Sequence, residues 1–454
     1  MATGPTAATV TLEETATAPM GPTATARTAG TPTARTEPTA TGRTAATPTE
    51  PTAPAERRPF AALGQLVGAA ETEPFLHHSF GREAFRRALP EGEASRLFGW
   101  AQLNQALAEH RLGPPRLKLE KGGQQVGRQV FRERRPSPAQ TVHDLDAPGL
   151  YDQLRDGATL VLDAVNELHP PLQRLCAGLA AEFCAHSQAN VYACWGTSQG
   201  FDVHWDDHDV FVVQVDGTKR WDLYGFTRPA PLRRDREAAP KPTEASEQMV
   251  LEAGDMLYLP RGYWHAAVGL GAPSLHLTIG VSRKTGADFL RWLADEAIAD
   301  AGVRADLQLE QDDAVLGEQV GELLRGLVAS HDPAELGRRY RRHLEASARH
   351  RPQLSFPHIG RPDDRIAPGD RLRLTDGATE LTPGAEPGSI RLSHRGVRYT
   401  LAAETAPAMS ALMAGTVLSY AELARQCGAV SDELLQAFVR DLLAGGVFAL
   451  ELGE

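Results

Sequence analysis

The sequence predicts an α+β protein built around a small antiparallel β-barrel or jelly roll, and two features carry that prediction. Residues 190–282 hold many short segments rich in β-branched and aromatic residues, separated by turns with glycine, proline or aspartate, which is the pattern of such a barrel. From about residue 286, apolar residues instead recur at helical spacing. Composition and pattern together indicate four units: 1–57, 58–285, 286–352 and 353–454.

The first unit is a low-complexity segment. In residues 1–57 the triplet Pro-Thr-Ala occurs five times, and aromatic residues are absent. Such a composition cannot bury enough apolar surface to offset the entropy lost on ordering. We therefore expect a disordered tail rich in alanine, threonine and proline.

The second unit should begin with helices and end in the barrel. Before the barrel we expect helices at 80–87, 93–110 and 170–186 and a buried strand at 157–163. Asp216-Gly217 predicts a hairpin turn between two of the barrel strands, and the turn at 253–255 predicts a second hairpin-like unit. The expected barrel strands are Val203–Asp206, Asp209–Val215, Lys219–Tyr224, Val250–Leu251, Met256–Leu259, Trp264–Val268 and Ser274–Ser282.

The remaining two units have different patterns. Helical periodicity predicts helices at 289–298, 315–330 and 333–348 in the third unit. The fourth opens with strand-like pieces at 370–374, 390–392 and 398–401 and ends with helices at 420–426 and 431–444 and a strand at 447–452. Ser419 and Ser431 are the expected N-caps of those two helices. The order helix, turn, helix, strand is similar to a winged helix.

Charge and cysteine content limit the functional classes. The net charge is −11, and residues 353–454 hold nine arginines and no lysine against thirteen acidic residues, a charge of −4; nucleic acid is therefore not expected as the main partner. The four cysteines match no zinc spacing and are expected to be reduced thiols. No segment resembles a secretory signal, and apolar runs are far shorter than the roughly 20 residues of a membrane helix. We expect a cytoplasmic protein with no membrane association.

A candidate metal site lies within the predicted barrel. His204 and Asp206 stand two apart on an expected strand, so their side chains share one face. His265, at the start of a later strand, can complete a facial set of two histidines and one carboxylate. That set leaves three positions open and is typical of non-haem iron(II) oxygenases. His208 is an alternative ligand by spacing. The non-functional alternative is that His204 is an ordinary half-buried histidine paired with Asp206.

Five motifs together resemble the JmjC ribosomal oxygenases, a branch of the cupin superfamily. They are Asn190-Val-Tyr192, Ser198-Gln-Gly200, His204-x-Asp206-x-x-Asp209-Val-Phe211, Gly217-Thr-Lys219-Arg-Trp221 and Pro260-x-Gly-x-Trp-His265. The similarity is close over about residues 140–285 and looser through the helical and winged-helix units, which that family also carries. The resemblance implies a double-stranded β-helix, the jelly roll of cupins and JmjC domains, a helical dimerisation region and a C-terminal winged-helix domain.

The resemblance also implies residue roles. His204, Asp206 and His265 match the iron(II) ligands, which are the catalytic residues. Lys219 matches the basic residue that pairs with the far carboxylate of 2-oxoglutarate, and a lysine inside a barrel is costly to bury without an anion; the alternative is a solvated turn lysine. Asn190 and Tyr192 match the co-substrate pocket, and Thr278 is expected to approach it. His276 is expected to be a core residue or to support the ligands.

The resulting functional hypothesis is an iron(II)- and 2-oxoglutarate-dependent dioxygenase that uses O2 to hydroxylate a protein side chain. The resemblance suggests a histidine or arginine of a ribosomal protein, and an acidic enzyme suits a basic target. It also suggests a homodimer. Alternatives are an oxygenase that tailors a ribosomally made peptide, a lysine demethylase, a cupin with another metal-dependent activity, and a non-catalytic cupin and winged-helix binding protein.

Overall fold

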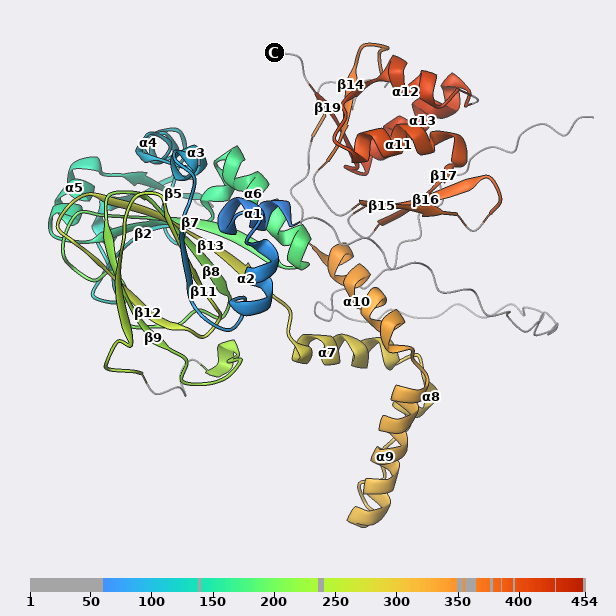
Figure 1. The fold of residues 1–454 in the computed structure, drawn as a ribbon, viewed down its shortest axis with the longest axis horizontal. Coiled ribbons are helices and arrows are strands. Elements are labelled where there is room, and N and C mark those ends of the chain that lie inside the picture. Colours follow the sequence, from blue (N-terminus) through green and yellow to red (C-terminus); the bar gives the residue numbers. More distant parts are fainter. Residues whose placement is uncertain are drawn as a thin grey trace, which may run out of the picture.

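A computed structural model describes residues 60–137, 140–235, 241–348, 354–355, 365–375, 379–384, 386–394, 397–428 and 430–451 (Figure 1). The expected disordered tail, 1–57, lies outside the described residues. Among the described helices, none is long and apolar enough to cross a membrane.

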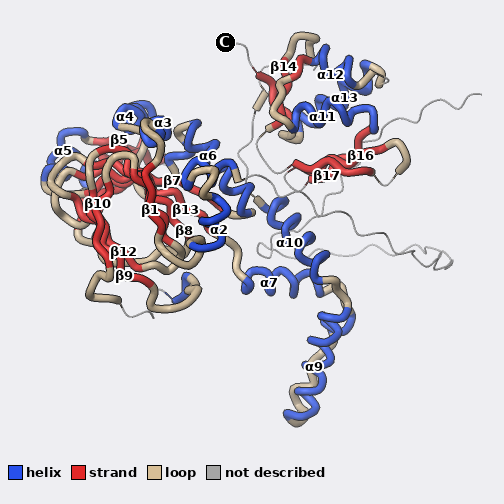
Figure 2. Tube along the Cα trace, viewed as in Figure 1, coloured by secondary structure: helices blue, strands red, loops and turns tan. Residues whose placement is uncertain are grey.

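Two antiparallel sheets face each other and form the barrel (Figure 2). The larger sheet has eight strands in the order β1 (Phe85–Ala88), β11 (Asp255–Leu259), β8 (Asp209–Asp216), β13 (Ser274–Ser282), β7 (His186–Cys194), β6 (Thr159–Leu162), β2 (Leu117–Lys121) and β3 (Gln124–Val126). The smaller sheet has the order β10 (Glu247–Leu251), β9 (Lys219–Gly225) and β12 (Trp264–Gly269). A mixed α/β architecture around a jelly roll, as predicted, is therefore present.

The predicted hairpin at Asp216-Gly217 is wrong in its pairing. The turn is present, with Gly217 at φ 66°, but β8 and β9 belong to different sheets. The same holds for the expected β10–β11 unit, because β10 pairs with β9 whereas β11 pairs with β8. A tight turn reverses the chain whether or not the two strands pair, so the sequence signal cannot distinguish a hairpin from a crossing between the sheets of a jelly roll.

Other elements differ from expectation locally. The expected helix 80–87 is wrong, because Phe85–Ala88 is strand β1 paired with β11. The expected strand Val203–Asp206 is also wrong: His204 makes only an isolated bridge there. The expected helix 93–110 is split into α3 (Glu93–Leu97) and α4 (Trp100–Glu109) by an extended Phe98 and Gly99.

Helices cover the outer face of the larger sheet. They are α1 (Ala61–Val67), α2 (Thr72–His78), α5 (Ala147–Arg155) and α6 (Pro170–Phe183), which share one apolar core with the sheet, as do α3 and α4. Strands β4 (Phe131–Ser137) and β5 (Gln140–Leu145) form a separate hairpin. Glu182 of α6 joins two helices, since its carboxylate accepts the amide N–H groups of Ala62 at 2.6 Å and Leu63 at 3.0 Å. These are amides of the first turn of α1, which lack partners within their own helix.

The alternation of side chains along the larger sheet decides which residues enter the barrel. In β13, odd-numbered apolar residues such as Leu277 and Ile279 pack in the core under the helices. Even-numbered residues therefore point the opposite way, into the barrel. Part of the interior is filled by a second apolar cluster that includes Val210, Val212 and Trp221. The rest of the interior is available for a site.

The chain continues through a helical segment into a C-terminal unit with its own core (Figure 1). The helices are α7 (Gly286–Ala297), α8 (Ala301–Arg304), α9 (Asp313–Ala329) and α10 (Pro333–Ser347). The C-terminal unit contains β14 (Arg371–Leu374), β15 (Thr379–Pro383), β16 (Ser389–His394), β17 (Val397–Ala402), α11 (Ala406–Met413), β18 (Leu418–Ser419), α12 (Tyr420–Gln426), α13 (Asp432–Ala444) and β19 (Phe448–Glu451). Ser419 and Ser431 cap α12 and α13 as predicted.

Candidate metal centre

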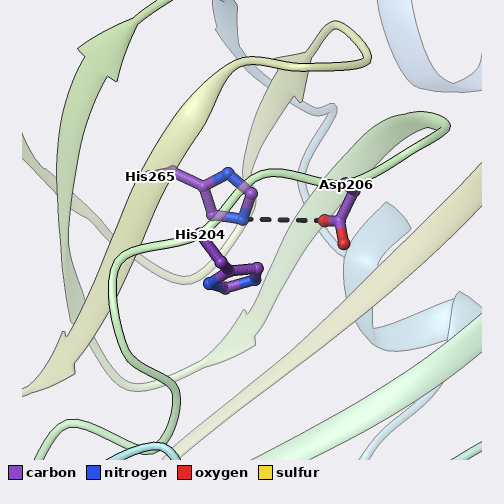
Figure 3. Close-up of side chains that lie close together, drawn as sticks. All are labelled: His204, Asp206 and His265. Atoms are coloured by element: carbon purple, nitrogen blue, oxygen red, sulfur yellow. Dashed lines mark ion pairs between the residues drawn. The ribbon is translucent and has the colours of Figure 1, made fainter. Parts of the chain in front are cut away.

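The structure brings His204, Asp206 and His265 together. Their ligand atoms all lie within 4.8 Å of one another, and His265 Nε2 is 3.7 Å from Asp206 Oδ2 (Figure 3). The two histidines are opposite each other in an antiparallel bridge, with their amide N–H groups and carbonyls exchanging hydrogen bonds of 3.1 and 2.8 Å. Their side chains therefore project from the same side of the bridge, with ring centroids 4.5 Å apart.

Local hydrogen bonds fix which nitrogen each histidine offers. His204 Nδ1 donates to the carbonyl of Asp202 at 2.7 Å, and His265 Nδ1 donates to the carbonyl of Tyr263 at 2.9 Å. A carbonyl can only accept, so the proton of each neutral ring sits on Nδ1. Nε2 of both rings then carries no proton, and its lone pair is available to bind a metal ion.

Burial keeps His265 neutral. Its side chain is buried, and desolvation together with nearby His204 lowers the pKa of His265 to about 4, against the opposing effect of Asp206. Asp206 is held by its backbone, since its carbonyl accepts the Gly262 amide N–H at 2.9 Å. The set of two imidazole nitrogens and one carboxylate oxygen fits iron(II) and other divalent first-row metals, and it occupies one face of their coordination sphere.

A cavity of about 720 Å³ opens onto this cluster from inside the barrel. The predicted pocket residues Asn190, Tyr192, Lys219 and Thr278 all line it. Both sheets contribute, as β7 and β13 belong to the larger sheet and β9 to the smaller. A cavity of this size is in the range of small-molecule sites.

Lys219 is buried at this cavity, with 4% of its surface exposed. Burial lowers the pKa of Lys219, and the neighbouring Cys194 partly opposes that shift. None of the ion pairs among the described residues involves Lys219, so no protein carboxylate there neutralises it. A buried ammonium without an anion is unfavourable, which makes this end of the cavity suitable for a carboxylate ligand.

Asn190, Tyr192 and Thr278 form one polar surface. Thr278 lies opposite Asn190 in the β13–β7 ladder, and the Tyr192 hydroxyl interacts with both side chains. Burial is the main reason that the pKa of Tyr192 is raised, so the phenol stays protonated. These residues offer neutral hydrogen-bonding groups beside the charged Lys219.

His208, the alternative ligand, lines the same cavity but is not part of the three-residue cluster. Its Nδ1 lies 3.2 Å from Asp207 Oδ1. Its ring also packs against Gly280 of β13, where a Cβ atom would approach His208 Nε2 to 2.8 Å. The ring thus packs against β13, and its nitrogens are not part of the three-residue cluster.

The sequence reasoning missed several residues of the cavity. Lys118 and Lys241 line it together with Lys219, so three of the chain's five lysines are at one site. Lys118 pairs with Asp163 at 3.1 Å, and Lys241 pairs with Asp202. Lysine is scarce in this chain, so the positions of the five lysines were the sequence signal that could have indicated these cavity residues.

Comparison with known proteins agrees with this geometry. Residues 166–289 match the family model described as the JmjC domain. A segment of 140 residues is 37% identical to a bifunctional lysine-specific demethylase and histidyl-hydroxylase NO66 of Drosophila mojavensis, covering 30% of this chain and 16% of that protein. A segment of 161 residues is 34% identical to ribosomal oxygenase 1 of Rattus norvegicus, covering 34% of this chain and 26% of that protein.

Solved structures extend the similarity of fold beyond the JmjC domain. YcfD, a ribosomal oxygenase from Escherichia coli, solved in complex with cobalt and 2-oxoglutarate, aligns with a TM-score of 0.51 and 17% identity over 84% of this chain and 98% of its own. Residues 166–289 therefore form a JmjC domain. In sequence, this part of the chain is similar to proteins named ribosomal oxygenase 1 and histidyl-hydroxylase NO66. The aligned segments span well under two thirds of the fly and rat relatives, 16% and 26% of their lengths.

Proposed function

We propose that the protein is an iron(II)- and 2-oxoglutarate-dependent oxygenase that hydroxylates a protein side chain. The observation that carries this proposal is that two histidines and one carboxylate, His204, Asp206 and His265, lie together and line a cavity that is also lined by the buried Lys219. A redox-inactive structural metal site would have no need of such a cavity, whereas an oxygenase must admit a co-substrate and O2.

In this proposal Nε2 of His204, Nε2 of His265 and the Asp206 carboxylate hold iron(II). The bound iron supplies the activation of O2, coupled to decarboxylation of 2-oxoglutarate to succinate and carbon dioxide. The chain supplies the rest. Lys219 binds the far carboxylate, and Asn190, Tyr192 and Thr278 orient the co-substrate through neutral hydrogen bonds. The apolar cluster around Trp221 excludes water from the barrel interior.

The proposed substrate is a histidine or arginine side chain of a ribosomal protein. The support comes from relatives named as a histidyl-hydroxylase and as ribosomal oxygenases. The net charge of −11 also favours a basic partner. A ribosomally made peptide is the alternative substrate, and stimulation of turnover by a ribosomal extract separates the two.

We also propose that residues 286–352 mediate a cytoplasmic homodimer and that 353–454 is a winged-helix-like unit. Support for a dimer is the apolar surface of α9, a helix without buried residues on which Leu324 and Val328 are 57% and 76% exposed. Support for the winged helix is the order α11, β18, α12, α13, β19, with β18 and β19 both flanking β14. Light scattering should give a dimer mass for the wild type and a monomer mass for Leu324→Glu/Val328→Glu.

The activity is tested by succinate release from 2-oxoglutarate. Protein loaded anaerobically with iron(II) is exposed to O2 with and without a ribosomal extract, and wild type is compared with His204→Ala and Lys219→Ala. Turnover stimulated by the extract and lost in both variants is the expected result. Mass spectrometry of the extract should then detect a ribosomal peptide heavier by one oxygen.

Two other outcomes have distinct meanings. Wild-type protein that binds neither iron(II) nor 2-oxoglutarate contradicts the oxygenase proposal. Protein that binds both but gains no turnover from the extract contradicts the ribosomal substrate alone, and short peptides are then the next substrates to test.

A further inference from the structure

His276 is a fully buried titratable group that lines the cavity and to which the proposed function assigns no role. It lies on β13 opposite Tyr192 of β7 and Gln214 of β8, and it is 3% exposed. Its ring stacks parallel on Tyr192, with centroids 4.8 Å apart and planes 9° apart. Trp221 of β9 meets the same ring edge-on at 5.6 Å. The imidazole is thus clamped between the two sheets of the barrel.

The electrostatic setting keeps this imidazole neutral. Burial, and then the nearby charge of Lys219, lower the pKa of His276 well below its usual value. No acidic side chain forms an ion pair with either residue in the described part of the chain. A neutral imidazole beside an unneutralised ammonium adds no second charge, yet it can still donate one hydrogen bond.

The two ring nitrogens are not equivalent. Nδ1 is sealed from solvent and has no hydrogen-bond partner among the described residues. Nε2 is not among the sealed polar atoms without a partner, and His276 lines the cavity, so Nε2 is the ring nitrogen that can reach a bound ligand. A buried N–H without an acceptor is costly, so the favoured tautomer carries its proton on Nε2.

We propose that His276 is a co-substrate-binding residue that donates its Nε2–H to the carboxylate held by Lys219. The ammonium and the imidazole N–H then bind the same carboxylate. The stacked Tyr192 and the edge-on Trp221 fix the position of the imidazole. This inference rests on the proposed function, because it specifies how the same cavity recognises a 2-oxo dicarboxylate.

The experiment is a calorimetric titration of 2-oxoglutarate into protein loaded with manganese(II) under anaerobic conditions. His276→Phe keeps a flat ring for stacking and removes the donor. It should raise the Kd for 2-oxoglutarate roughly 10- to 100-fold, the effect of losing one hydrogen bond to a charged group. The Kd for manganese should stay within about twofold, because His276 is not a ligand.

A matched pair of variants separates the donor from the shape of the ring. The amide nitrogen of glutamine falls near the position of Nε2, whereas that of asparagine falls near Nδ1. His276→Gln should therefore keep 2-oxoglutarate affinity within a few-fold of wild type, and His276→Asn should be as weak as His276→Phe. This comparison decides the question even if His276→Phe fails to fold.

Each outcome bears on one claim. Wild-type affinity in His276→Phe, or equal weakening in the glutamine and asparagine variants, overturns the donor role of His276 and leaves the oxygenase proposal intact. Wild-type protein that binds manganese but not 2-oxoglutarate contradicts the proposed function, and the role of His276 falls with it.

Discussion

At the scale of single residues, the protonation state of His265 links the candidate metal centre to the stability of the fold. The unfolded chain protonates this imidazole near pH 6.5, whereas burial lowers its pKa in the folded protein to about 4. Between these values the unfolded state binds more protons, so the free energy of unfolding of the metal-free protein should fall as pH falls from 6.5 to 4. The full loss attributable to this group is on the order of 3 kcal/mol.

Urea unfolding of the metal-free protein at pH 7 and pH 5 measures the part of that loss that falls above pH 5. His265→Gln has no proton to gain, so its free energy of unfolding should change less between the two pH values than that of the wild type. An identical change in the free energy of unfolding in both proteins would show that burial does not lower the pKa of His265.

Lys219 should show a conflict between stability and binding. The free protein buries this ammonium with no acidic partner among the described residues. Lys219→Met keeps the length of the side chain and removes the charge, so it should raise the stability of the ligand-free protein by roughly 0.5–2 kcal/mol. The same change should abolish measurable 2-oxoglutarate binding.

Thermal unfolding and calorimetry on the same samples measure both effects. Lys118→Met is the control, because Lys118 is 26% exposed and already paired with Asp163; removing it should not stabilise the protein. A Lys219→Met protein less stable than wild type would mean that Lys219 contributes more to packing than its burial costs.

At the scale of elements, the turn between β8 and β9 carries the chain from one sheet to the other and places Lys219. Gly217 adopts φ 66° there, and a Cβ atom would lie 2.0 Å from the carbonyl oxygen of Pro273. Gly217→Ala should therefore destabilise the protein by roughly 2–4 kcal/mol, combining the strain of a positive φ with a backbone clash.

Gly225, at the other end of β9, is the matched control. It adopts φ 78°, and apart from its two chain neighbours no residue has a heavy atom within 4 Å of the place that a Cβ atom would take. Gly225→Ala should therefore show only the strain of the backbone, roughly 1–2 kcal/mol. Chemical unfolding of the two variants measures the difference. Equal losses would mean that the segment around Pro273 relaxes to accommodate the methyl group.

The elements also show what the sequence could and could not predict. Strand β13 was predicted at its observed bounds, Ser274–Ser282, because a nine-residue run rich in β-branched and apolar residues has few other interpretations. Strand β1 was missed, since four residues, Phe-Arg-Arg-Ala, are too short for a period and are set by pairing with β11. Strand β2, Leu117–Lys121, was missed although apolar and charged residues alternate along it, because five residues give only about two periods of that pattern.

The residues of the candidate site were likewise predicted only in part. The sequence named the three residues that the structure brings together as a candidate metal site, although the expected strand at 203–206 makes only one isolated bridge. Lys118 and Lys241 were not assigned to the cavity, because only the packing of β2 and of the chain before β10 against the barrel brings them there. Local spacing predicts groups on one segment, and long-range packing decides the rest.

At the scale of the whole molecule, the barrel and the C-terminal unit are built on separate cores. The two apolar clusters of the barrel end at Val281, and that of the C-terminal unit begins at Ile366. Between them, Tyr340 of α10 packs on Phe289 and Trp292 of α7, with ring centroids 5.2 and 5.0 Å apart. A chain cut after residue 348 therefore keeps both apolar clusters of the barrel and the contacts of Tyr340 with α7.

We expect a chain that ends at residue 348 to fold and to bind manganese(II) and 2-oxoglutarate with Kd values within about twofold of the full chain, since sites far apart and without shared contacts behave additively. Calorimetry on both proteins measures this, and circular dichroism controls for folding. Turnover of a protein substrate by the same truncated chain is a separate readout: if it falls while co-substrate binding holds, the C-terminal unit contributes to substrate capture. A co-substrate affinity more than tenfold weaker would instead show that the cavity depends on the C-terminal unit, contrary to the separation of the cores.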